Sequence, residues 1–101
     1  MKSKHTIIWS PRAKNQFFAI VDFINEKWNK NTADKFIDKV NKSIIALQSM
    51  PDAFPESNKK KIRRCVITKQ TTVFYCLEKN SIELAAFFDT RQNPKKLKKK
   101  I

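Results

Sequence analysis

Apolar residues recur at helical spacing over the first half of the chain. Between residues 11 and 29 they follow one another in steps of three or four, which places them on one face of an amphipathic helix: Ala13, Phe17, Ile20, Ile24 and Trp28. Ser10 supplies a capping oxygen at the start of this helix. Pro11 suits the first helical position, where no N–H is required.

A second apolar stripe predicts another helix, which begins near Ala33 and ends before Pro51, since the residue preceding a proline avoids the helical region. Its apolar positions are Phe36, Ile37, Val40, Ile44 and Leu47. Asn31 or Thr32 is expected to cap it. Because only a few polar residues separate the two helices, we expect an antiparallel helix hairpin.

Shorter segments rich in β-branched and aromatic residues predict strands on both sides of the hairpin. One precedes it, at residues 5–9, and three follow it, at residues 63–67, 71–77 and 81–88. In the last strand alternate residues are apolar and are expected to share one face: Ile82, Leu84, Ala86 and Phe88. Ala85 and Phe87 lie between them, which indicates a central strand or one with a covered second face.

These elements define an α+β fold with an N-terminal strand, a helix hairpin and a three-stranded antiparallel meander. We expect the helices on one face of the sheet, because two helices cover only one face of about four strands. The candidates for the opposite face are Cys65, Phe74, Cys76 and Phe87. Of these, Phe74 and Phe87 are predicted to form an apolar partner patch.

The composition narrows the classes of protein. A length of 101 residues indicates one domain, residues 1–101, with a basic tail at residues 95–101. The absence of glycine excludes a glycine-rich phosphate loop and a Rossmann fingerprint. Two cysteines make no disulfide framework, and Cys and His lack metal-ligand spacing, so we expect no metal or cofactor. With no apolar run long enough to span a membrane and no signal peptide, we expect a cytoplasmic protein.

The net charge of the chain indicates what kind of partner it binds. The chain has 22 basic and 9 acidic residues and a net charge of +13, which favours a polyanion or an acidic protein as partner. Half of the cations fall in two clusters, at residues 59–64 and 91–100. The lysines predicted to contact a nucleic acid or another target are Lys59, Lys60, Lys61, Lys95 and Lys96. The alternative is that these lysine runs are solvated surface.

The strongest candidate for chemistry is the polar corner after the last strand, where Pro94 prevents the strand from continuing. Arg91 is expected to grip an anion there with its planar fork, aided by Arg63 or Arg64 across the sheet. Alternatively, Arg91 ties down the strand end through Asp89. His5, the single histidine, has no neighbouring Cys or Asp in the sequence to orient it for catalysis.

Several segments, taken in this order, resemble the RelE/ParE family of bacterial type II toxin–antitoxin toxins. They are Ser10-Pro11 with Ala13, Trp28, the helix from Ala33 to Leu47 that ends at Pro51, Ile62-Arg63-Arg64, Phe74-Tyr75, and the run from Phe88 to Pro94. The resemblance implies a compact toxin that a cognate antitoxin inhibits. It also implies two possible targets, since RelE-like members cleave messenger RNA on the ribosome and ParE-like members inhibit DNA gyrase.

The residues favour the gyrase target slightly. RNA cleavage through the 2′-hydroxyl needs a base, an acid and cations, and Arg63, Arg64 and Arg91 are the candidate catalytic cations. Many RelE-like nucleases have a Tyr or His near the C-terminus, but residues 92–101 contain neither. A plain nucleic-acid-binding module without toxin activity is the alternative from another class.

Overall fold

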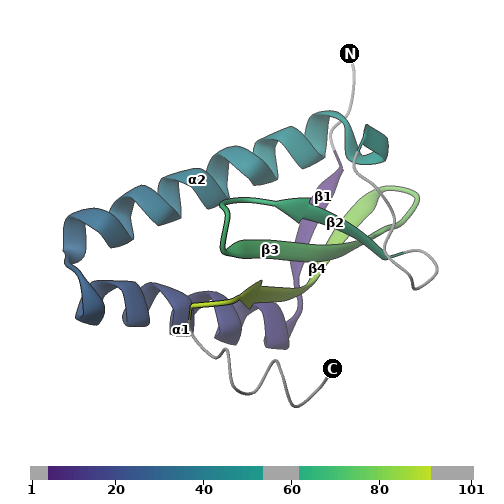
Figure 1. Cartoon of the computed structure of the whole chain (residues 1–101). Coiled ribbons are helices and arrows are strands. Elements are labelled where there is room, and N and C mark those ends of the chain that lie inside the picture. The colour runs from purple at the N-terminus through teal and green to yellow at the C-terminus, as the bar shows by residue number, and fades with distance from the viewer. Residues whose placement is uncertain (1–4, 54–61, 92–101) are drawn as a thin grey trace.

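The computed structural model describes residues 5–53 and 62–91, and it confirms the predicted α+β fold (Figure 1). In chain order its elements are β1 (Thr6–Trp9), α1 (Pro11–Lys27), α2 (Lys30–Ser49), a short 3₁₀ helix η1 (Pro51–Ala53), β2 (Ile62–Val66), β3 (Thr71–Leu77) and β4 (Ser81–Asp89). The strands form one sheet in the order β1-β4-β3-β2. The pairs β2–β3 and β3–β4 are antiparallel, as the meander requires, and β1 lies parallel to β4. The residues Lys59, Lys60, Lys61, Lys95 and Lys96, predicted to contact a target, lie outside the described residues.

The two helices begin where polar side chains satisfy their first backbone N–H groups. The Ser10 hydroxyl accepts a hydrogen bond from the Ala13 N–H at 3.0 Å, as predicted for α1. The predicted cap of α2 is wrong, because Asn29 caps it and not Asn31 or Thr32. The Asn29 side chain accepts from the Thr32 N–H at 2.8 Å, so the helix starts three residues earlier than the apolar stripe indicates. The connection between the helices is therefore very short.

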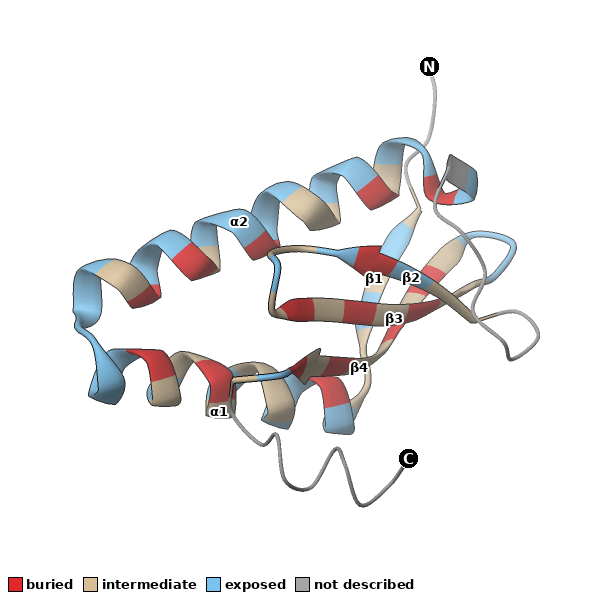
Figure 2. Ribbon diagram, viewed as in Figure 1, coloured by how far each residue is buried: buried red, intermediate tan, exposed pale blue. Residues whose placement is uncertain are grey.

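The core lies between the helix hairpin and one face of the sheet, as Figure 2 shows by the buried residues along the inner sides of α1 and α2. The helices contribute Ala13, Ile20, Ile24, Ala33, Phe36, Val40 and Leu47, and the sheet contributes Cys65, Val73, Tyr75, Ile82, Leu84 and Phe87. Tyr75 is fully buried, and its hydroxyl donates to the Pro51 carbonyl at 2.7 Å. This bond joins the centre of the sheet to the end of the hairpin.

A β-bulge changes which residues of β4 face the core. Phe74 lies opposite Ala86, but the next residue, Tyr75, lies opposite Leu84, so Ala85 is an extra residue in the ladder. An extra residue reverses the alternation of the side chains beyond it. Ile82 and Leu84 are buried as predicted, but the next buried residues are Phe87 and Asp89 and not Ala86 and Phe88.

The bulge and the position of β2 correct the prediction for the second face. Phe87 and Cys65 are each 3% exposed and belong to the core, so neither forms part of a partner patch on the open face. Phe74 and Cys76 are only partly buried. Val66, which sequence reasoning did not assign to this face, is 65% exposed. A partner patch that includes Phe74 stays a prediction.

Side chains at the start of α1 form hydrogen bonds with the part of the β4 backbone that lies beyond the end of β1. The Ser10 hydroxyl donates to the Ala85 carbonyl at 2.9 Å, and the Gln16 side-chain oxygen accepts from the Phe87 N–H at 2.8 Å. These bonds replace the strand neighbour that β4 loses where β1 ends at Trp9. They fix the bulged half of β4 against α1, and with it the position of Asp89.

Candidate functional site

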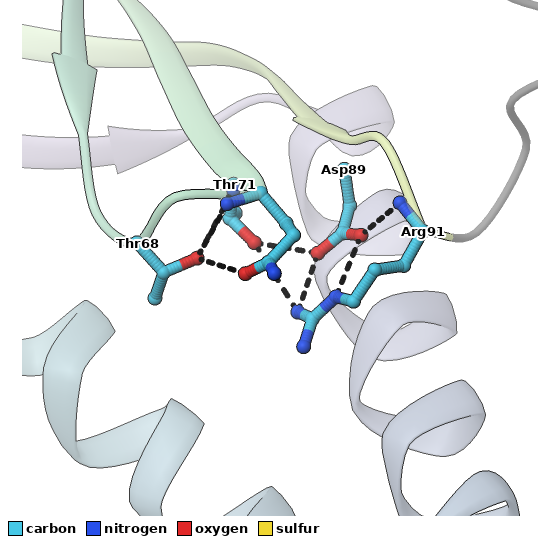
Figure 3. Close-up of polar contacts among 5 residues, drawn as sticks. Thr68, Thr71, Asp89 and Arg91 are labelled. Atoms are coloured by element: carbon cyan, nitrogen blue, oxygen red, sulfur yellow. Dashed lines mark hydrogen bonds and ion pairs between the residues drawn. The ribbon is translucent and has the colours of Figure 1, made fainter.

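The corner after β4 is built around the buried carboxylate of Asp89, whose side chain is fully shielded from solvent (Figure 3). Arg91 grips it with two donors, Nε to Oδ1 at 3.1 Å and Nη2 to Oδ2 at 2.7 Å. The Arg91 backbone N–H also donates to Oδ1, at 2.9 Å, and the Thr71 hydroxyl donates to Oδ2. Every oxygen of this carboxylate therefore accepts hydrogen bonds from the first residue of β3 or from Arg91.

The electrostatics of the corner keep this carboxylate charged. Burial raises the pKa of Asp89, but the hydrogen bonds from Arg91 and Thr71 together with the charge of Arg91 outweigh burial and lower the pKa below its usual value. Arg91 itself is 24% exposed. Its guanidinium carbon lies 5.8 Å from the centre of the Trp28 ring, close enough for a cation–π contact with the end of α1.

This geometry favours the second of the two interpretations of Arg91. Two of its nitrogens are bound to Asp89, and Nη2 is also 3.5 Å from the Thr71 hydroxyl. The fork that would bind a phosphate bidentately is already occupied by a carboxylate of the same chain. Arg91 therefore joins β4, β3 and the end of α1.

The predicted cluster of Arg91 with Arg63 or Arg64 does not form. In the sheet Arg63 aligns with Tyr75 and Leu84, and Arg64 aligns with Phe74 and Ala86. Asp89, which Arg91 binds, pairs with Thr71, so at about 3.3 Å per residue along β3 this corner lies about 13 Å from the row of Arg63 and about 10 Å from that of Arg64. Arg64 also alternates with buried Cys65 and so lies on the open face, whereas Asp89 faces the core.

Arg63 lies at the end of the sheet next to η1. Its Nη1 donates to the Asp52 carbonyl at 3.4 Å, and its charge acts on Tyr75. Burial raises the pKa of Tyr75 to about 12, although the charge of Arg63 opposes the rise. A phenol that is buried, donates to Pro51 and titrates near 12 is poorly suited to proton transfer at neutral pH.

The structure adds a site that sequence reasoning missed, a pocket of about 330 Å³ at the corner between β1 and α1. It is lined by Trp9, Lys14, Phe17 and Phe18. The apolar stripe predicted from the sequence included both Phe17 and Phe18, and Lys14 was not interpreted. The available signal was a doubled aromatic, Phe17-Phe18, because one helix face cannot bury two adjacent residues equally. Phe18 is 53% exposed, so it lies outside the core in which the predicted stripe placed it.

Over residues 5–53 and 62–91, no group of three His, Cys, Asp or Glu residues is placed to hold a metal ion. Within the same ranges neither helix combines the length and the apolar character needed to cross a membrane.

The fold is shared with chains from several solved structures. A chain of the chromosomal ParDE system of P. aeruginosa is similar with a TM-score of 0.73 and 14% identity, covering 84% of this chain and 95% of that one. The YoeB dimer of Staphylococcus aureus gives a TM-score of 0.59 and 16% identity, covering 85% of this chain and 97% of that one. For the E. coli DinJ–YafQ toxin–antitoxin complex the values are 0.60 and 10%, with coverage of 90% and 98%. At these identities the likeness concerns the fold alone.

The sequence match is more specific than the fold. Residues 7–94 match the family described as the ParE toxin of the type II toxin–antitoxin system, parDE. The match spans most of the chain, and the chain belongs to this family of toxins. Among curated proteins, none matches the chain in sequence.

Proposed function

We propose that this toxin inhibits growth by binding DNA gyrase, without cleaving RNA, and that an acidic cognate antitoxin neutralises it in the cytoplasm. The observation that carries the choice of target is the arrangement of the three candidate catalytic arginines. Arg91 is bound to Asp89, Arg63 lies beside η1, and Arg64 lies on the open face. An RNA-cleaving site needs its cations gathered around one phosphate with an acid and a base at hand. Inhibition by binding has no such requirement.

Charge supports an acidic antitoxin. At a net charge of +13, the chain carries a field that attracts acidic proteins and speeds their association. Two of the similar structures come from toxin–antitoxin pairs, ParDE and DinJ–YafQ. In this proposal the lysines at positions 59–61, 95 and 96 contact the target. The bound antitoxin prevents the toxin from reaching that target.

Supercoiling and message cleavage, measured on the same preparation, test the target. Purified chain is added to gyrase with relaxed plasmid and ATP, and in parallel to ribosomes translating a defined message. We expect supercoiling to fall at near-equimolar chain and the message to stay intact. Cleavage of the message with normal supercoiling would overturn the gyrase target. DNA binding without either effect would favour a nucleic-acid-binding module.

Growth under induced expression, with and without the neighbouring reading frame, tests the antitoxin. We expect growth arrest by the chain alone and rescue with a co-purifying acidic protein. Normal growth on strong expression of folded chain would contradict the toxin role.

A further inference from the structure

The pocket between β1 and α1 has firm apolar walls on one side. Trp9 stacks on Phe87 with ring centroids 5.5 Å apart and an angle of 16° between the planes, and it meets Phe17 edge-on at 5.3 Å. Phe17 in turn lies 6.2 Å from Phe36 of α2. Since Phe36 and Phe87 are buried, Trp9 and Phe17 are supported from the core. These two walls are therefore in place before any ligand binds.

The other side of the pocket is open and apolar at the surface. Phe18 is 53% exposed, and its ring lies 5.6 Å from Phe17. A large exposed aromatic beside a concave apolar site is typical of a surface that a partner covers. The volume of about 330 Å³ is at the lower end of the range of about 300–1,000 Å³ for ligand sites, which suits one large side chain.

The charge around the pocket indicates the chemistry of the partner. Lys14 lines the pocket and is exposed. Between residues 11 and 21 the only charged residues are Arg12 and Lys14, and the first acid of α1 is Asp22. An exposed lysine beside aromatic walls fits an apolar side chain with a carboxylate next to it.

We propose that this pocket anchors the acidic antitoxin, whose apolar side chain inserts between Trp9, Phe17 and Phe18 while a neighbouring carboxylate pairs with Lys14. The inference rests on the proposed function, because it takes the antitoxin as the occupant. It adds the place of contact and the kind of residue that the antitoxin brings to it. A second copy of the chain and a neutral apolar ligand are the competing occupants.

Affinity for the acidic protein encoded by the neighbouring reading frame, measured by calorimetry, tests the anchor. Phe18→Ser should weaken binding about tenfold or more, the loss expected on removal of a central aromatic contact. Lys14→Glu should weaken it about fivefold, and less at high salt. Ile45→Ser and Lys39→Glu are matched controls on α2, since Ile45 is 56% exposed and Lys39 is exposed. These controls should change affinity less than about twofold, and melting curves check that all four variants fold.

The outcomes separate the inference from the function on which it rests. Equal affinity of all four variants, with wild-type chain toxic and rescued, would overturn the anchor and leave the proposed function standing. Wild-type chain that neither arrests growth nor binds the neighbouring protein would overturn the proposed function. Concentration-dependent dimerisation that Phe18→Ser abolishes would assign the pocket to a second copy and refute the inference.

A peptide measurement tests the pocket without the antitoxin. In a Trp28→Phe variant, Trp9 is the only tryptophan and reports on the pocket by fluorescence. The probe is the acetylated, amidated peptide Asp-Glu-Leu-Glu-Asp. We expect a saturable change that disappears when alanine replaces the leucine of the peptide or when Phe18→Ser is added. A wild-type pocket that gives no saturable change with this peptide, or an equal one with the alanine peptide, would contradict the anchor.

Discussion

Removing the Arg91 side chain tests whether the corner after β4 is a structural clamp. Arg91→Ala leaves the buried Asp89 carboxylate with two donors, the Thr71 hydroxyl and the backbone N–H of residue 91. Breaking a buried pair by removing one partner costs about 3–5 kcal/mol. Because Arg91 is 24% exposed and water can replace part of it, we expect a loss of about 2–3 kcal/mol.

The partner variant and the double variant complete this experiment. Asp89→Ala removes the acceptor of the same bonds and should lower stability by a similar amount. In a domain of about 100 residues, each of these losses corresponds to a fall in Tm of about 10–15 °C. The double variant should lose less than the sum of the single variants, with a coupling of about 1–2 kcal/mol. Urea unfolding of the wild type, the two single variants and the double variant measures this coupling energy.

The pH dependence gives an independent check of the clamp. The pKa of Asp89 is lowered in the fold, so the unfolded chain takes up this proton more readily. The contribution is complete above the ordinary Asp pKa of about 3.9, and it is lost as the pH falls through the lowered folded value. Unfolding free energy should therefore fall more steeply with acid, from about pH 5 downward, in the wild type than in Asp89→Asn.

Two results would refute this reasoning. One is additive behaviour of the single variants, which would show that the two side chains do not act as a pair. The other is an Arg91→Ala protein with unchanged melting and lost growth inhibition, which would restore Arg91 as an anion contact. Arg91→Lys sharpens the distinction, because a lysine keeps the charge but cannot reproduce the two-point grip on Asp89.

Two further predictions follow from the bulge and from the buried tyrosine. Phe87→Ala should cost about 3–4 kcal/mol and Phe88→Ala about 1 kcal/mol, because Phe87 is 3% exposed and packs on Trp9, whereas Phe88 is only partly buried. Equal losses in urea unfolding would contradict the bulge at Ala85. Tyr75→Phe should cost about 1–2 kcal/mol, because the Pro51 carbonyl loses its donor. Absorbance titration of the wild type should show no tyrosinate until the pH nears 12 or the chain unfolds, and ionisation near pH 10 in folded protein would contradict this burial.

The sequence by itself determined the elements and their order. Helical spacing and the Ser10-Pro11 start located α1, and β-branched runs between short turns located the meander, because these signals depend on near neighbours in the chain. The resemblance to the toxin family could likewise be recognised from several short segments and their order along the chain. The sequence also allowed a pair between Arg91 and Asp89, which lies two residues earlier, as one of two interpretations of Arg91.

Only the tertiary structure decided which face each residue of β4 takes. From Ala85 to Phe88 every residue is apolar, so the sequence carries no contrast that would show the alternation reversing at the bulge. That reversal puts Phe87 under Trp9 and turns Asp89 inward, where it binds Arg91 and Thr71. The separation of Arg91 from Arg63 and Arg64 likewise depends on strand register, which is set by partners far apart in sequence. The sequence identified Arg91 as a candidate anion-binding residue. The packing of α1 against the bulged half of β4 places Asp89 where it forms an ion pair with Arg91.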